Sequence, residues 1–572
     1  MIAIVFAACF VLFVLAYVFY GRFIEKRLDI NPDRPTPAHT LKDDVDYVPT
    51  PTLILFGHHF SSIAGAGPIV GPIIAGLAFG WLPAILWIVG GAILVGGVHD
   101  FSALAASLRH QGRSVGELCR DLLSPVAYRL YLLFIWLTMM YIQIVFLDLT
   151  ALTFAPLNPA AVENTDAVAL TLRQGGTVAT ASLIYIILAV LFGFTIYRLK
   201  KPVWLGTLIY VPLVFAALWV GHVFPLAADK MPALLGSPKN TWLIVLMVYC
   251  FLAAVLPVWI LLQPRDYLSS YLLYASVGGG ALGVVFAGLT GKVTIQYPAF
   301  IGWSDPQLKF IFPALFVTIA CGAVSGFHSI VASGTTAKQI NRESAAKPVA
   351  YGAMLVEGLL AVLALAAVMI LVQKPVGATP QVIFAQGLAQ FLAPFGISTN
   401  AAVTFGLLAV STFLLTTLDT CTRLARFIFE ELFQLRGFKA RIIGTAASLL
   451  LPALVVFRQV PGAGGKMMAA WQAIWPAFGT TNQLMAALAL MVVFAWLFEE
   501  HRGAWFIVIP MVFMCVTTLT SLTQLVLSNL RGGSPLIGWL SLVLWVLAIA
   551  LIIDTYFNLR KRWRGEHVGA ST

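Results

Sequence analysis

Ionisable side chains are scarce in the long apolar stretches of this 572-residue chain, yet five of them stand in short polar motifs there: His58, His59, His99, Asp100 and His328. Histidine changes charge near neutral pH, so this set is typical of proton binding or transfer. Asp100 either orients a neighbouring imidazole or accepts a proton itself. Adjacent helical residues point about 100° apart, so only one of His58 and His59 needs to face a shared pathway. The alternative for each histidine is an ordinary hydrogen bond to a backbone carbonyl.

The first motif, GHHFSSIAGAGPIVGP, also contains helix breakers. Proline lacks an amide donor and glycine relaxes the helix, so we expect an interruption from Gly65 to Pro68. Inside a bilayer, free backbone groups are costly unless a substrate or ion uses them. We therefore expect a substrate site in which a carboxylate meets backbone amides near Gly65 and Gly67, beside Ser61 and Ser62.

A second interruption is predicted in the segment CFLAAVLPVWILLQPRDYL, where Pro257 falls in mid-membrane. Trp259 and Gln263 stand beside this proline and are expected to line the same substrate pocket. The alternative is an ordinary kink, because proline is common in membrane helices. Arg265 and Asp266, which follow, are expected to form part of an inner gate or a loop cap.

A third motif, SGFHSIVASGTTAKQI, places Ser325, Ser329, Ser333 and Thr336 at helical spacing with His328 alongside. This spacing predicts one polar stripe that faces the interruption near Gly65 and helps bind a proton or another coupling ion. The alternative is that the small residues simply allow close helix packing.

Four further ionisable residues are expected to act as gate residues, as a relay group or as structural partners of other charges. Asp148 lies in the outer half of a predicted span. Asp419 is expected to pair with Arg423, one helical turn later, as a structural salt bridge. Glu357 is either a relay group or a buried partner for another charge.

Composition indicates the solvent in which these residues work. The chain is 60% hydrophobic and 10% charged, whereas soluble domains average about 25% charged residues. The apolar runs are continuous and not alternating, which predicts an all-α polytopic membrane protein. The net charge of +11 is assigned to basic loops, so no nucleic acid is expected as a partner. The six cysteines contain no CxxC motif and are read as apolar residues, so no metal site is predicted.

About fifteen transmembrane helices can be placed from the apolar segments. They are 2–20, 51–79, 81–107, 128–155, 179–199, 203–224, 241–263, 268–290, 309–333, 349–373, 400–418, 441–457, 471–497, 504–528 and 536–557. Most of the 35 lysines and arginines fall on one side if the N-terminus is outside. The positive-inside rule then predicts an outer N-terminus and an inner C-terminus.

Spans 2 and 7, which carry the two predicted interruptions, are five apart and so run in opposite directions. This predicts a LeuT-like core of two five-helix inverted repeats, made of spans 2–6 and 7–11. The predicted regions are an extra helix and cytoplasmic loop (1–50), the first repeat (51–225), the second repeat (240–420) and a C-terminal four-helix accessory region (421–572).

Three quoted stretches also carry a family resemblance: GHHFSSIAGAGPIVGPIIAGLAFGWLPAILWIVGGAILVGGVHDF, LPVWILLQPRDYL and SGFHSIVASGTT. They resemble signatures of the carbon starvation protein A family across nearly the whole chain. The resemblance implies a bacterial or archaeal cytoplasmic-membrane transporter of peptides or, with proton coupling, of pyruvate. It also implies the LeuT-like fold of the amino acid–polyamine–organocation superfamily.

The expected function is secondary active, proton-coupled uptake of pyruvate or small peptides, with no enzymatic activity. The first alternative is a sodium-coupled symporter of a small carboxylate or amino acid. Alternatives of another class are a membrane nutrient receptor or channel, and a haem-binding redox protein. We expect no cofactor besides H⁺ or Na⁺ as coupling ion. The expected partners are a small-molecule substrate and membrane lipid, and the sequence makes no prediction of oligomeric state.

Overall fold

The computed structural model describes residues 1–43, 46–157, 166–257, 260–375, 377–461, 467–532 and 534–564. The described residues are almost entirely helical. Two small antiparallel sheets lie in loops and pair β1 (Ser304–Asp305) with β2 (Lys309–Phe310), and β3 (Val460–Pro461) with β4 (Met467–Met468).

The α-helices follow one another along the chain: α1 (Ile2–Leu15), α2 (Gly21–Arg27), α3 (Pro37–Thr40), α4 (Thr52–Ile63), α5 (Gly67–Phe79), α6 (Trp81–Gly91), α7 (Gly97–Arg109), α8 (Val115–Leu122), α9 (Pro125–Phe154), α10 (Asp166–Gly193), α11 (Val203–Val223), α12 (Pro238–Val255), α13 (Leu262–Leu289), α14 (Ile311–Ile319), α15 (Gly326–Gly334), α16 (Ala353–Met369), α17 (Pro380–Leu392), α18 (Thr399–Leu432), α19 (Phe438–Val456), α20 (Ala470–Glu499), α21 (Trp505–Gly532) and α22 (Pro535–Trp563). Wider π-helical turns connect some of them: η1 (Ala16–Tyr20), η2 (Ala92–Gly96), η4 (Phe194–Arg198) and η10 (Lys347–Gly352). Short 3₁₀ turns make up the rest: η5 (Ala228–Lys230), η6 (Leu234–Gly236), η7 (Ala320–Gly322), η8 (Thr336–Lys338), η9 (Glu343–Ala345) and η11 (Ala393–Phe395).

Many of the helices are long enough to span a membrane. Among the described residues, 14 helices are long and apolar enough to cross a bilayer. The pair α4 and α5 together forms a fifteenth span, bent by 46°. The prediction of a polytopic all-α membrane protein with about fifteen spans is therefore confirmed.

The interruption in predicted span 2 lies where the sequence indicates it. Helix α4 ends at Ile63, and Ala64 leaves the helical conformation with ψ at 70°. Helix α5 begins at Gly67 with Pro68 in its first turn, where the missing amide of proline is no loss. Pro68 therefore starts the second half-helix.

Predicted span 7 differs from the expectation. Helix α12 ends at Val255 and Leu256 is extended, so the predicted continuation to residue 263 was wrong. Proline cannot continue a hydrogen-bonded helix, so the chain turns at Pro257 and α13 starts at Leu262. Arg265 and Asp266 thus belong to the beginning of α13. Trp259 lies outside the described residues.

A second interrupted span occurs in predicted span 9, where it was not expected. Helix α14 ends at Ile319, and Ala320 takes a φ of 39° at the start of a short 3₁₀ turn. Ser325 is extended, and α15 begins at Gly326. The chain therefore passes through this span as two half-helices.

The two interrupted spans are in direct contact. A Cβ atom added to Gly67 would lie 2.6 Å from Sγ of Cys321, and one added to Gly71 would lie 2.5 Å from the carbonyl oxygen of Thr318. Only glycine allows this approach, because any side chain would push the backbones apart. The beginning of α5 thus packs directly on the interruption between α14 and α15.

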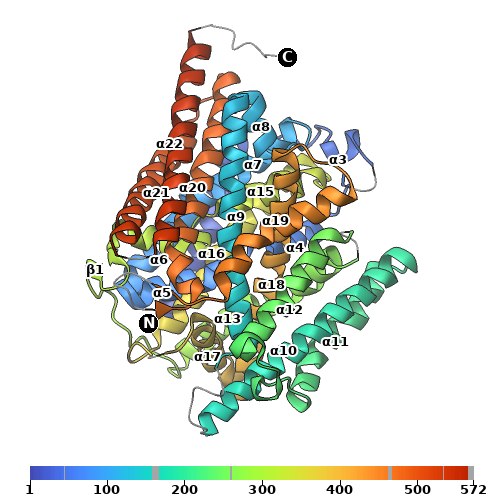
Figure 1. Cartoon of the computed structure of the whole chain (residues 1–572), viewed down its shortest axis with the longest axis vertical. Coiled ribbons are helices and arrows are strands. Elements are labelled where there is room, and N and C mark those ends of the chain that lie inside the picture. Colours follow the sequence, from blue (N-terminus) through green and yellow to red (C-terminus); the bar gives the residue numbers. More distant parts are fainter. Residues whose placement is uncertain are drawn as a thin grey trace.

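The remaining helices enclose this pair. Figure 1 shows α9 running along the long axis of the molecule, with α20, α21 and α22 on one flank and α10 and α11 on the opposite flank. Helices α9 and α18 pack extensively against each other, whereas α11 packs mainly on α10. The short helices α8 and α17 lie toward opposite ends of the bundle (Figure 1).

Candidate functional site

Four buried ionisable side chains from α7, α15 and α16 form one connected set, the Asp100 cluster: His99, Asp100, His328 and Glu357. Nδ1 of His99 lies 2.7 Å from Oδ1 of Asp100, and Nδ1 of His328 lies 2.8 Å from Oδ2 of Asp100. Nε2 of His328 lies 3.3 Å from Oε2 of Glu357. All four side chains are fully buried. The cluster therefore forms a continuous chain of proton-binding groups across three helices.

Several atoms of this cluster lack hydrogen-bond partners. Both carboxylate oxygens of Glu357 are without one, as are Nε2 of His99 and Nε2 of His328. The His328–Glu357 contact is thus close enough for an ion pair but lacks hydrogen-bond geometry. Buried polar groups normally find partners, and buried charges must be compensated. Gain or loss of a proton therefore directly changes the charge and the hydrogen bonding of this cluster.

His59 of α4 contacts the 3₁₀ turn η8, which follows α15. Its Nδ1 lies 2.8 Å from Oγ1 of Thr336, and its Nε2 is buried without a partner. The predicted polar stripe on predicted span 9 therefore meets α4 at Thr336. Ser329 and Ser333 instead donate to carbonyl oxygens of their own helix, and Ser333 also accepts from the amide of Val115 next to α8.

A second buried set, the Arg265 cluster, joins α12, α13 and α18: Tyr249, Arg265, Asp266 and Asp419. The Arg265 guanidinium donates to both carboxylate oxygens of Asp419, over 2.8 Å to Oδ1, and to Oδ1 of Asp266 over 3.0 Å. Tyr249 donates its hydroxyl to Oδ2 of Asp419 over 2.7 Å. A two-pronged contact of this kind fixes orientation as well as charge. The predicted role of Arg265 and Asp266 as part of an inner gate stays a prediction.

The predicted salt bridge between Asp419 and Arg423 was wrong. Arg265 occupies both oxygens of Asp419, and Arg423 donates instead to the carbonyl oxygen of Leu256. That carbonyl lies at the end of α12, where a helix presents unpaired acceptors and favours a cation. Arg423 thus holds the end of α12 where Pro257 stops the helix.

Helix α4 contacts the Arg265 cluster and the chain directly after α15. Nδ1 of His58 lies 3.7 Å from Oδ2 of Asp266, and Ser61 donates to the carbonyl oxygen of Asp266 over 3.0 Å. Ser62 donates within α4, to the carbonyl oxygen of His58. The adjacent histidines therefore face different partners, with His58 on the Arg265 cluster and His59 on Thr336.

The interruption near Gly65 is closely packed. A Cβ atom added to Gly65 would lie 2.4 Å from Oγ1 of Thr417. At the other interruption, Asn482 of α20 accepts from the backbone amide of Phe327 over 3.1 Å and donates to Oγ of Ser325 over 3.1 Å. Asn482 thus takes the place of a capping residue at the start of α15. Sequence reasoning missed it, although the polar run TTNQ at 480–483 inside an apolar span was a usable signal.

Two residues predicted for the substrate pocket are not brought to the interruption. Pro257 is exposed. Gln263 is partly exposed and accepts from the Tyr197 hydroxyl over 3.1 Å. Because α12 ends before Pro257, the chain carries both residues to the margin of the helix bundle. This part of the predicted site was wrong.

Asp148 has a structural role that links three helices. Its Oδ1 lies 2.5 Å from Nζ of Lys239 in α12, and its Oδ2 accepts from the amide of Trp471 over 3.0 Å. The amide belongs to the first turn of α20, where a negative charge is favourable. Asp148 therefore ties α9 to the beginnings of α12 and α20.

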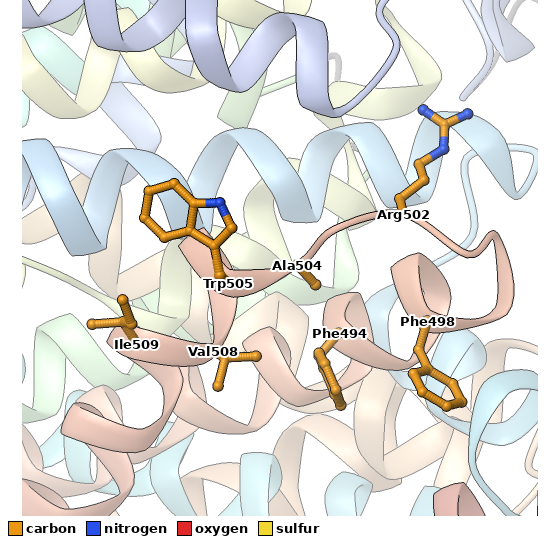
Figure 2. A pocket seen from close by; sticks show the side chains of 7 residues that line it. All are labelled: Phe494, Phe498, Arg502, Ala504, Trp505, Val508 and Ile509. Carbon is orange, nitrogen blue, oxygen red and sulfur yellow. The ribbon is translucent and has the colours of Figure 1, made fainter. Parts of the chain in front are cut away.

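A cavity of about 400 Å³ lies away from these clusters, at the loop between α20 and α21. Its lining includes Phe494, Phe498, Trp505 and Ile509. Figure 2 shows the Arg502 side chain extending away from the rings of Phe494 and Phe498. Arg502 contacts Glu500 and Asp29. This apolar hollow lacks the converging polar groups that would orient a small acid.

The sequence comparisons agree with the resemblance seen in the motifs. A family model described as carbon starvation protein CstA matches residues 1–379 and 373–521. The peptide transporter CstA of Bacillus subtilis is 32% identical, and the match covers 96% of both chains. The pyruvate/proton symporter BtsT of Escherichia coli is 31% identical, with 89% of this chain and 80% of that one covered.

Solved structures are more distant. A manganese transporter from Eremococcus coleocola is 15% identical with a TM-score of 0.40, and the match covers 91% of this chain and 99% of that one. The chain is a multi-pass membrane protein, and it belongs to the carbon starvation protein CstA family.

Proposed function

We propose that this chain is a secondary active transporter that couples uptake of pyruvate or small peptides to proton entry. The observation that supports this proposal most is the buried chain His99–Asp100–His328–Glu357. Its protonatable groups come from three helices, and several of their nitrogen and oxygen atoms have no hydrogen-bond partner. Relatives over nearly the whole chain are named as a peptide transporter and a pyruvate/proton symporter, which supports the same function.

In the proposed mechanism, Glu357 and His328 hold the coupled proton. A proton on this pair alters the attraction between α15 and α16, because the His328–Glu357 contact depends on the charge of both groups. Asp100 keeps the His328 ring in place through Nδ1 and so leaves Nε2 directed at Glu357. Binding or loss of the proton is thereby linked to the position of α15, one half of an interrupted span.

The proposed place for a substrate carboxylate is between the beginnings of α5 and α15. Helix N-termini present free amide groups and favour anions. Gly67, in the first turn of α5, lies against Cys321, four residues before Ser325 at the start of α15. The Asp100 cluster contributes His328 from the first turn of α15, so substrate and proton would act on the same half-helix.

A LeuT-like inverted repeat remains our proposal, with a revised division. Spans 2 and 9 are both interrupted, and they are an odd number of spans apart, so they run in opposite directions. Each is followed by a span with a π-helical turn (η2 or η10), then a short helix (α8 or α17) and a long helix (α9 or α18). We place α4–α9 with α12 and α13 in the first repeat, and α14–α20 in the second. This replaces the expected boundaries 51–225 and 240–420 and makes α10 and α11 an insertion.

The proposed location is the bacterial or archaeal cytoplasmic membrane, with the N-terminus outside and the C-terminus inside. The distribution of Lys and Arg among the loops supports this orientation. Asp148 then lies toward the outer end of the bundle and Arg265 toward the inner end.

The test is uptake by the purified protein in proteoliposomes, with pyruvate, other short acids, amino acids and dipeptides as a panel. We expect an inward proton gradient alone to drive accumulation of at least one of these. Accumulation driven by sodium at equal pH on both sides would favour the sodium-coupled alternative. Flux without accumulation under any gradient would favour a channel.

A further inference from the structure

We propose that His58 and Asp266 form a second proton-binding site, so that each transport cycle carries two protons. The inference rests on the proposed proton-coupled function. It adds a site at the Arg265 cluster, separate from the Asp100 cluster.

The proposal rests on the charge balance of the Arg265 cluster. One guanidinium faces two carboxylates, Asp419 through both oxygens and Asp266 through one. The side chains of Arg265, Asp266 and Asp419 are at most 3% exposed. With both carboxylates ionised, the cluster has one negative charge in excess, which is unfavourable away from water. A single bound proton removes that excess.

His58 lies beside the carboxylate oxygen of Asp266 that this proton would neutralise. Its Nδ1 lies 3.7 Å from the Oδ2 of Asp266, the oxygen that Arg265 leaves unoccupied. The proton is held between the His58 ring and Oδ2 of Asp266, so the site requires both side chains. The pair then binds one proton more than it does when Asp266 is ionised and His58 is neutral.

Among the described contacts, Arg265 is the cation that binds Asp266, whereas Arg423 of α18, one turn from Asp419, donates to the carbonyl oxygen of Leu256. Helix α13 contributes Arg265, and α18 contributes Asp419. Tyr185 of α10 donates to the carbonyl oxygen of Arg265, and Tyr249 of α12 donates to Asp419, so neither phenol neutralises Asp266. Helices α15 and α16, which also pack on α4, contribute His328 and Glu357, which contact each other. On η10, Lys347 lies 3.0 Å from Glu25.

Access to water separates the two sites. The His58 side chain is 20% exposed, whereas the side chains of the Asp100 cluster are fully buried. His58 is therefore more accessible than any side chain of the Asp100 cluster in this conformation.

Helix α4 links the two sites mechanically. His58 and His59 are adjacent, and Ser61 binds the backbone of Asp266 from the same helix. A movement of α4 that separates His58 from Asp266 must also change the contact of His59 with Thr336. Helix α4 thereby connects the His58–Asp266 pair to the chain directly after α15, the half-helix that carries His328.

The experiment measures the proton-to-substrate ratio in proteoliposomes, from the membrane potential at which a fixed substrate gradient gives no net flux. We expect a ratio of two for the wild-type protein and of one for His58→Gln and for Asp266→Asn. Asp148→Asn, which changes a buried carboxylate that pairs with Lys239 outside both clusters, is the matched control and should keep the ratio of two.

A wild-type ratio of one, or a ratio of two that persists in either folded variant, overturns the second site while leaving proton coupling intact. A wild-type protein whose flux ignores the proton gradient overturns the proposed function itself. If Asp266→Asn does not fold, His58→Gln decides, because it keeps Asp266 and its contact with Arg265.

Discussion

Nδ1 of His328 lies 2.8 Å from Oδ2 of Asp100, although 228 positions of sequence separate the two residues. This bond joins α15, one half of an interrupted span, to α7, a continuous helix. Glu357 extends the contact to α16 on the other ring nitrogen. A proton held here would act on one half-helix of an interrupted span, and this is the basis of the transport mechanism proposed above.

Replacement of Arg265 by Met should destabilise the protein strongly. The substitution leaves Asp419 and Asp266 buried without their cation, and loss of one partner of a buried ion pair costs about 3–5 kcal/mol. Thermal unfolding in detergent, followed by tryptophan fluorescence, measures the effect. The double variant Arg265→Met/Asp419→Leu should recover part of the loss. Equal unfolding temperatures for Arg265→Met and wild type would mean that the cluster does not stabilise this conformation.

Gly65→Ala should slow transport by opposing the closed packing at the interruption. The new Cβ would lie 2.4 Å from Oγ1 of Thr417, so α4 and α18 must separate. Thr417→Ala removes that oxygen, and the double variant Gly65→Ala/Thr417→Ala should regain most of the lost rate. Initial uptake rates of all three variants provide the measurement. A double variant as slow as Gly65→Ala would show that steric contact with Thr417 is not the cause.

Asn482→Ala should loosen the beginning of α15. The side chain accepts from the amide of Phe327 and binds Ser325, and loss of a capping side chain typically costs about 0.5–2 kcal/mol. We expect faster hydrogen exchange at residues 325–329 and a higher KM for substrate. Gln381→Ala, another buried amide but on α17, is the control. Unchanged exchange at the start of α15 would argue against a capping role.

The loop after α2 should be held by Asp29 in a pH-dependent way. Arg34 and Arg502 hold the pKa of the Asp29 carboxyl below its usual value, through contacts of 3.0 and 3.2 Å. A depressed pKa means that the stabilisation is complete above the ordinary value of about 3.9 and is lost as pH falls through the lower folded value.

Asp29→Asn should therefore expose the chain around Arg34 to limited trypsin cleavage at neutral pH, where the wild type is protected. Asp33→Asn, in the same loop, is the control. Equal cleavage of Asp29→Asn and wild type would show that these ion pairs do not hold the loop.

The sequence predicts the number of spans because each needs a long apolar run, and it predicts the interruption at Gly65 because Gly and Pro act locally. It does not predict the interruption at Ala320, which has no proline and depends on contact with α5. The short helices α8 and α17 were not predicted, because both are too short to span a bilayer. For α8, the capping box formed by Ser114 and Glu117 was an available signal.

Pairing between charges was the least predictable part of the site. Spacing along one helix suggests Asp419 with Arg423, but the tertiary fold brings Arg265 of α13 to Asp419 with better two-pronged geometry. Glu357 had no local motif, and only the packing of α16 on α15 and α7 shows its partner. Histidines and aspartates in apolar segments were recognisable from type alone, whereas their partners required the three-dimensional arrangement.

The most direct test of proton coupling through the Asp100 cluster compares wild type with Glu357→Gln in proteoliposomes on a solid-supported membrane, without sodium. We expect substrate addition to evoke a proton current in wild type. Glu357→Gln should lose that current but keep exchange of substrate for substrate. Glu431→Gln, which alters a carboxylate near the end of α18 bonded to Tyr128, should behave as wild type. A wild-type current in Glu357→Gln would contradict proton coupling through this cluster.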